Sequence, residues 1–327
     1  MRDDPRLRVL LALVAAFALA FGLAACGDDD DESDGGGGGT SANLIEENPD
    51  NNGVSIKVGS KNFDEQLILA EIYAQGLEAA GYDVSTDLNL GDETIAFKAL
   101  TSGEIDAYPE YTSTILTSIF DVAPEDVPGD AQQAFEDSQD EFDKRNLVAY
   151  PPTPFSSANA VGLLTKTADD LGVSTISDLE GKSQDLVLAG SPECRQRIDC
   201  LLGLEQNYGL EFKEFTPVDI GLRYEVLDNG DADLSILFTT DAQLFTDPDK
   251  YTVLEDDKHV LPAGNVLFSV RKQTADEAGQ DLGDTVENVQ SNMTVKVMQE
   301  LNARVAIDKE KPEDVAHEYL VEFGYVK

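Results

Sequence analysis

Strand-like and helix-like segments alternate through this chain, and this alternation is the feature that most restricts its fold. Residues 54–58 alternate apolar and polar side chains as a strand does, and residues 64–80 follow with apolar side chains at helical spacing. The elements expected next are a strand at 82–88, a helix at 94–101 and a strand at 105–108. This order predicts an α/β lobe built on a largely parallel sheet.

A second set of expected elements follows a stiff, proline-rich connector at 151–154. The segments expected after it are strands at 160–164, 186–189, 212–215 and 234–238, with a helix at 219–227. The chain is therefore expected to leave a first lobe near Pro154 and to return to it near Thr239. Lobe one would comprise residues 54–154 and 239–327, and lobe two would comprise residues 155–238. Two crossing segments make a hinge, and the cleft beside a hinge suits a small ligand.

The first 53 residues are predicted to lie outside the folded lobes. Arginines precede a short apolar run, and small residues then lead to Cys26, which is typical of a lipoprotein signal peptide at 1–25. Cys26 would be the lipidated first residue of the mature protein, anchored to the membrane. Residues 26–53 would form an acidic, glycine-rich tether. An ordinary signal peptide with a chance cysteine, or an uncleaved anchor, are the alternatives.

The charge of the chain excludes one class of partner. Its 327 residues carry a formal net charge of -41, which repels nucleic acid. The acidity fits adaptation to high ionic strength, where repulsion is screened, and it equally fits an acidic extracytoplasmic protein.

Besides Cys26 the chain has two cysteines, Cys194 and Cys200. In an oxidising exterior compartment so close a pair predicts a disulfide, which would stiffen the segment that carries Arg197. Two buried free thiols are the alternative. The only histidines, His259 and His317, lack ligand spacing with the cysteines, so neither a metal nor another cofactor is expected.

Motifs of the common enzyme classes are missing from the sequence. It contains no Walker-type phosphate loop and no Gly-x-Ser-x-Gly elbow, and neither histidine stands near an obvious nucleophile. Catalysis is therefore not expected.

Several short motifs are spread over most of the chain. They are Gly59-Ser60-Lys61-Asn62-Phe63, Tyr108-Pro109-Glu110-Tyr111-Thr112, Ser191-Pro192-Glu193 leading to Arg197, and Thr239-Thr240-Asp241 with Glu255-Asp256-Asp257-Lys258. Together they resemble the substrate-binding component of osmoprotectant ABC transporters, which captures glycine betaine, choline and carnitine. The resemblance runs from about Val54 to the C-terminus. It implies a two-lobed, periplasmic-binding-protein-like fold of type II with two hinge-crossing strands.

The ligands of that family dictate the chemistry to look for. A quaternary ammonium cannot donate a strong hydrogen bond, and it is held instead by aromatic faces. The chain has no Trp, so Tyr and Phe must supply them. The resemblance assigns this role to Tyr111, Tyr224 and Phe238.

The carboxylate of a betaine needs donors, and the resemblance assigns Lys61, Thr114 and Arg197. Lys61 stands just before a helix N-terminus, and Arg197 can form a bidentate pair. Asn159 occupies a position where the family pattern usually has another cage tyrosine. Its donor and acceptor make a ligand with a hydroxyl or amide plausible.

The sequence thus predicts a lipid-anchored extracytoplasmic receptor for a small zwitterionic or cationic osmolyte. Its partners would be an ABC permease and the ATPase subunits of that permease. The alternatives are a receptor for another small polar amine or amino acid, an extracytoplasmic enzyme on the same scaffold, and a structural surface lipoprotein.

Overall fold

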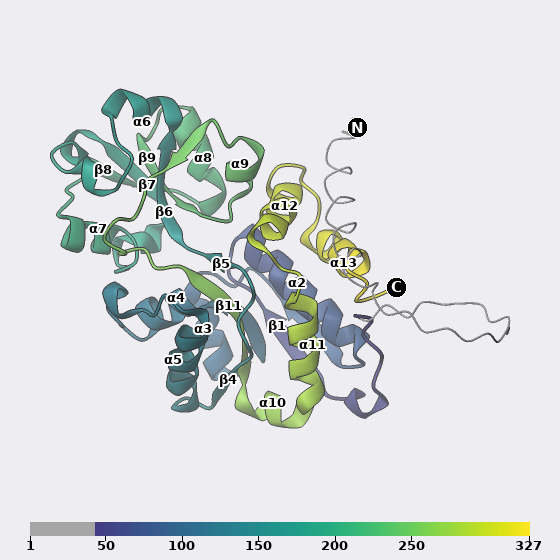
Figure 1. Cartoon of the computed structure of the whole chain (residues 1–327). Helices are drawn as coiled ribbons and strands as arrows, with labels where there is room; N and C mark the ends of the chain where they lie inside the picture. Colours follow the sequence, from purple (N-terminus) through teal and green to yellow (C-terminus); the bar gives the residue numbers. More distant parts are fainter. Residues whose placement is uncertain (1–42) are drawn as a thin grey trace, which may run out of the picture. The chain divides into compact units, whose positions relative to one another are not determined.

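Two β-sheets, each with its own covering helices, carry the fold (Figure 1). The computed structural model describes residues 43–327, so the predicted signal peptide, Cys26 and most of the predicted tether lie outside the described residues. Within the described part, no helix is both long enough and apolar enough to cross a membrane.

The first sheet has the strand order β2-β1-β3-β11-β4, with the short β5 also paired to β11. Its strands are β1 (Ser55–Gly59), β2 (Asp83–Asp87), β3 (Ala107–Tyr111), β4 (Leu147–Ala149), β5 (Ser156–Ser157) and β11 (Gly264–Arg271). β1 pairs in parallel with β2 and β3, as predicted. β11 runs antiparallel to its neighbours β3, β4 and β5.

The second sheet has the strand order β10-β6-β9-β7-β8. Its strands are β6 (Asn159–Leu164), β7 (Val187–Gly190), β8 (Glu214–Pro217), β9 (Leu234–Phe238) and β10 (Tyr251–Val253). β7 is parallel to β8 and β9, whereas β6 is antiparallel to β9 and β10. The strands expected at 160–164, 186–189, 212–215 and 234–238 therefore exist, and they belong to one sheet.

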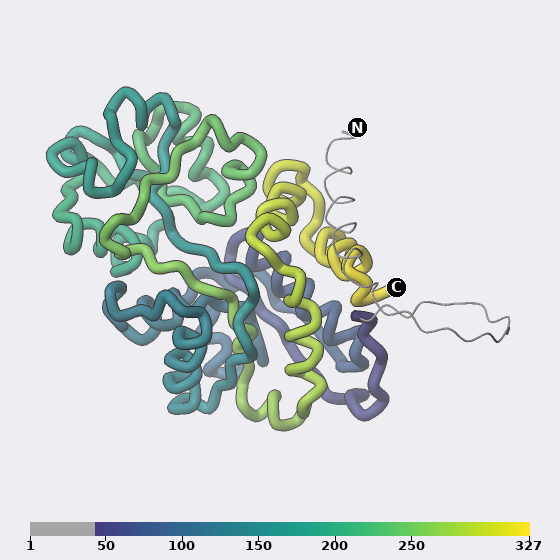
Figure 2. Tube along the Cα trace, viewed as in Figure 1, coloured from purple at the N-terminus to yellow at the C-terminus, as the bar shows by residue number. Residues whose placement is uncertain are grey.

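The chain crosses between the sheets after β5 and again after β10. In Figure 2 the two crossing segments, teal and green, run side by side, consistent with the pairing of β5 and β11. The predicted return at Thr239 is too early, because β10 still pairs with β6 of the second sheet. At that point the chain only touches lobe one: α12 (Val295–Ala306) donates side-chain hydrogen bonds to the carbonyls of Thr239 and Thr240, at 3.1 and 2.9 Å.

Side chains of the first sheet alternate between two cores, as the pleat requires. Val266 and Phe268 of β11 join the larger core, and Leu267 between them joins the smaller one. Helices of the larger core are α2 (Asp64–Ala79), α10 (Lys272–Ala278), α11 (Gln280–Gln290), α12 and α13 (Pro312–Glu322). Helices of the smaller core are α3 (Glu93–Ser102) and α5 (Ala131–Asp143). The second sheet has its own core with α6 (Thr165–Leu171) and α7 (Leu201–Tyr208). Three short helices complete the set: α4 (Thr112–Thr114), α8 (Arg223–Asp228) and α9 (Ala242–Thr246).

The folded part begins before residue 54, where the predicted tether was to end. Ile45 packs against the larger core, and its backbone N–H donates to the carbonyl of Tyr325 at 2.9 Å. Asn51 is buried and donates to the carbonyl of Ala80 at 2.8 Å. Residues 45–51 therefore belong to lobe one, because the side chain of Ile45 packs in its core and hydrogen bonds join Ile45 and Asn51 to the residues that follow α13 and α2.

Truncating Ile72 on the buried face of α2 should lower the free energy of unfolding by about 2–5 kcal/mol. Ile72 is fully buried in the larger core, so Ile72→Ala leaves a cavity. Ile95 on α3 is 49% exposed, and Ile95→Ala is the matched control, with an expected change of about 0.5 kcal/mol or less. Denaturant unfolding measures both; equal losses would contradict this packing.

Candidate ligand-binding site

A cleft lined from both lobes holds the candidate site. It contains about 740 Å³ of space between the protein atoms, and part of this space is open solvent. The side chains that line it gather from the ends of β1, β3 and β9, from the start of β6, and from the segment before α7. Six of the seven predicted ligand-binding residues line the cleft: Lys61, Tyr111, Thr114, Asn159, Arg197 and Phe238.

Three aromatic rings form one wall of the cleft. Phe63 precedes α2, Tyr111 ends β3 and Phe238 ends β9. The ring centroid of Phe63 lies 6.4 Å from that of Tyr111 and 5.2 Å from that of Phe238. Phe63 thus joins two rings predicted from the sequence. It was not predicted as a binding residue, although it closes the first of the quoted motifs.

Tyr224, the third predicted cage ring, lies in a different environment. It packs edge to face against Tyr251, with centroids 4.8 Å apart, and its hydroxyl donates to Asp241 at 3.0 Å. The preceding residue, Arg223, lines the cleft and places its guanidinium 4.0 Å from the ring centroid of Phe238. Arg223 therefore lines the cleft and Tyr224 does not, because one position along a helix turns a side chain by about 100°.

Tyr111 is held from behind by a buried acid. Its hydroxyl donates to Glu65 at 2.5 Å, and the amide of Asn302 donates to the same carboxylate at 2.7 Å. Burial raises the pKa of Glu65, whereas the hydrogen bonds from Tyr111 and Asn302 act in the opposite direction. Burial, and then the nearby Glu65, raise the pKa of Tyr111, so the phenol stays neutral. The ring is therefore fixed in place and keeps its electron-rich face.

The two cations predicted to bind a carboxylate already meet carboxylates of the protein. The ammonium of Lys61 forms a buried ion pair with Glu110 and lies 4.7 Å from the ring centroid of Tyr111. Arg197 donates to both oxygens of Asp199, at 2.8 Å from Nε and 2.6 Å from Nη2. Burial opposes the charge of Arg197, but the Asp199 and Glu93 carboxylates outweigh it and raise its pKa.

Asn159 and Thr114 complete the polar lining. Asn159 begins β6, and its amide donates to the carbonyl of Asp199 at 2.9 Å. Asn159 therefore supports the loop that carries Arg197, and it also lines the cleft. Thr114 ends the short helix α4 that follows Tyr111.

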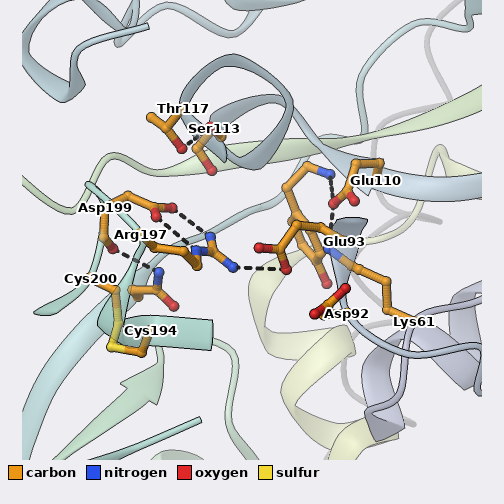
Figure 3. Close-up of polar contacts among 12 residues, drawn as sticks. Lys61, Asp92, Glu93, Glu110, Ser113, Thr117, Cys194, Arg197, Asp199 and Cys200 are labelled. Carbon is orange, nitrogen blue, oxygen red and sulfur yellow. Dashed lines mark hydrogen bonds and ion pairs between the residues drawn. A yellow bond between two sulfur atoms is a disulfide. The ribbon is translucent and has the colours of Figure 1, made fainter. Parts of the chain in front are cut away.

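The predicted disulfide is present and frames the Arg197 loop (Figure 3). Cys194 and Cys200 are buried, and Arg197 and Asp199 lie between them. The loop sits directly on α7, because a Cβ added at Gly203 would lie 1.8 Å from the carbonyl oxygen of Ile198. Disulfide and packing together hold the guanidinium at the cleft.

Replacing both cysteines by serine should lower the free energy of unfolding by about 2 kcal/mol, since the bond closes only a short loop. The measurement is denaturant unfolding with and without a thiol reductant. Reductant should shift the midpoint of the wild-type protein toward that of the double variant and leave the double variant unchanged. A wild-type midpoint equal to that of the double variant before reduction would contradict this contribution.

Comparison with known proteins gives the family. The model of the substrate-binding domain of ABC-type glycine betaine transport systems matches residues 54–322. The glycine-betaine-binding protein of Pseudomonas aeruginosa is 32% identical over 279 residues, covering 82% of this chain and 88% of that protein. The carnitine transport binding protein OpuCC of Listeria monocytogenes is 25% identical over 280 residues, with coverages of 83% and 87%.

The fold agrees with a solved structure of the same kind. A crystal structure described as a glycine betaine/carnitine/choline ABC transporter superposes with a TM-score of 0.65 at 25% identity, covering 82% of this chain and 99% of that one. This match and the two sheets confirm the predicted two-lobed, periplasmic-binding-protein-like fold. The chain therefore belongs to the family of substrate-binding domains of ABC-type glycine betaine transport systems, and it is the substrate-binding component of an importer of this type.

Proposed function

We propose that the cleft captures one small quaternary-ammonium compound of the class that includes glycine betaine, choline and carnitine. The observation that carries this proposal is the gathering of Phe63, Tyr111 and Phe238, from both lobes, on one wall of a cleft whose remaining lining is polar and charged. The methyl groups of the ammonium would lie against the rings. The rest of the ligand would point toward Arg197, Thr114 and Asn159.

The energetics of such a site are adequate for a transport receptor. Each ring face contributes about 0.5–2 kcal/mol to holding a cation, more when water is excluded. Micromolar affinity corresponds to about -8 kcal/mol. Three rings together with polar contacts reach that value after the costs of ordering the ligand and closing the lobes.

The wider assembly follows from the same proposal. Substrate-binding proteins of import systems act outside the cytoplasm, and this chain would be held at the outer face of the membrane by lipid on Cys26. Its loaded form would dock on an ABC permease, whose ATPase subunits drive uptake. The chain itself would catalyse no reaction.

A second candidate is a receptor for another small polar amine or amino acid. The specific observation in its favour is the polar character of part of the lining, which includes Asn159 and the carboxylates of Asp92 and Glu193. An amine that donates hydrogen bonds would use these acceptors, whereas a quaternary ammonium would not.

Calorimetric titration of the purified protein with glycine betaine, choline, carnitine and proline betaine tests the proposal. Saturable micromolar binding of at least one of them is expected. Tyr111→Leu should weaken it by about tenfold or more, because the ligand loses a ring face worth up to about 2 kcal/mol.

Tyr82→Leu is the matched control, since Tyr82 is also buried, does not line the cleft and donates its hydroxyl to the carbonyl of Ala278 within lobe one. It should leave the affinity within about threefold. Circular dichroism checks that both variants fold. No binding of any of the four compounds to the folded wild-type protein would contradict the proposal and favour the second candidate.

A further inference from the structure

The cleft contains more negative than positive side chains. Its lining includes three cations, Lys61, Arg197 and Arg223, and four carboxylates, Asp92, Glu93, Glu193 and Asp199. Two further carboxylates, which do not line the cleft, form ion pairs with the same cations: Glu110 pairs with Lys61, and Asp241 pairs with Arg223. A ligand that brings its own carboxylate would therefore meet cations that are already compensated.

Arg197 is the cation best placed for a ligand carboxylate, and both ends of its guanidinium are engaged. Asp199, on the same loop, takes the edge formed by Nε and Nη2. Nη1 at the other end lies 3.3 Å from Oε2 of Glu93. Figure 3 shows the guanidinium lying between these two carboxylates.

Glu93 reaches Arg197 from the opposite lobe. It is the first residue of α3, which packs in the smaller core of lobe one, whereas Arg197 precedes α7 of lobe two. The side chain of Glu93 is only 7% exposed, and that of Arg197 is 16% exposed. The pair therefore spans the cleft in a region from which much of the water is excluded, where charge interactions are strong.

A ligand carboxylate and a ligand cation would meet this pair differently. A ligand carboxylate would have to replace Glu93 at Nη1 of Arg197. Glu93 would then remain as a second anion next to the ligand carboxylate, and the repulsion between the two like charges would oppose binding. A ligand with a hydroxyl in place of the carboxylate leaves the pair intact and adds a positive charge to a cleft with excess negative charge. Specificity arises here from rejecting one ligand as well as from attracting the other.

We infer that Glu93 is a specificity-determining residue: by occupying Arg197 across the cleft, it makes the site select quaternary-ammonium cations that lack a carboxylate over zwitterionic ones. This inference rests on the proposed function, since it concerns the choice among quaternary-ammonium ligands of the same cleft.

Choline and glycine betaine are the probes, because both carry a trimethylammonium group and they differ in a hydroxyl against a carboxylate. Calorimetric titration of the purified wild-type protein should give choline a dissociation constant about tenfold or more below that of glycine betaine. Glu93→Gln keeps the shape of the side chain and removes its charge. It should tighten glycine betaine by about tenfold and weaken choline, so that the ratio falls to about one or reverses.

Glu104→Gln is the matched control, because it removes one carboxylate from the exposed turn after α3, outside the lining of the cleft and away from the Arg197–Glu93 pair. It should change the ratio of the two affinities by about threefold or less, since an exposed charge is screened. A Glu104→Gln shift as large as that of Glu93→Gln would overturn the assignment to Glu93 and ascribe the selection to overall charge.

The wild-type titration separates this inference from the proposed function, even if Glu93→Gln fails to fold. Glycine betaine binding as tightly as choline, or more tightly, overturns the inference and leaves the proposed function standing. Failure of both probes, and of the other quaternary-ammonium compounds, to bind the folded protein overturns the two together.

Discussion

Within the described part of the chain, each cation that lines the cleft lies beside a carboxylate, and the rest of the site depends on this pairing. An ammonium or guanidinium taken out of water costs several kcal/mol unless a partner compensates its charge. Glu110 compensates Lys61, and Asp241 compensates Arg223. Lys61 in turn lies over the ring of Tyr111, and Arg223 lies over Phe238. The ion pairs therefore position the two rings as well as the charges, and losing one partner would disturb the aromatic wall.

A second layer of hydrogen bonds joins this wall to the contact between the lobes. Asn302 on α12 donates to Glu65, which holds the hydroxyl of Tyr111, and also to the carbonyl of Thr240. Thr240 follows closely on Phe238, a ring contributed by the other lobe. A ligand between Tyr111 and Phe238 therefore contacts side chains whose supports meet at Asn302. Such a ligand favours whichever arrangement of the lobes lets both rings contact it at once.

The repeating elements of the fold could be predicted from the sequence because their burial is periodic. The strand at 54–58 and the helix after it carry their apolar residues at spacings that only one secondary structure can bury. β10 could not be recognised in this way, because three residues are too few to show a period, and its pairing with β6 moved the return to lobe one beyond Thr239. Residues 45–51 were assigned to the tether for a similar reason. Ile45 and Asn51 stand alone among polar neighbours, and their hydrogen-bond partners near the ends of α13 and α2 come close only in the folded lobe.

The site was predictable where a side chain follows directly from a strand end, and less so elsewhere. Tyr111 and Phe238 are each the last residue of a strand, and the pairing of the strands in the sheet fixes where each strand ends. Their position at the cleft therefore follows from the sheet. Tyr224 and Arg223 are neighbours on a short helix, and only the packing of that helix decides which of the two faces the cleft. The acidic partners of the cleft cations could not be predicted from the sequence. The chain has 64 acidic residues, and nothing in the local sequence distinguishes Glu93 or Glu110 from the others. Their roles come from long-range pairing: Glu93 meets Arg197 across the cleft, over a separation that sequence spacing cannot encode. Residue types in motifs therefore indicate the kind of ligand, and the pairing of charges in three dimensions decides which member of that kind fits best.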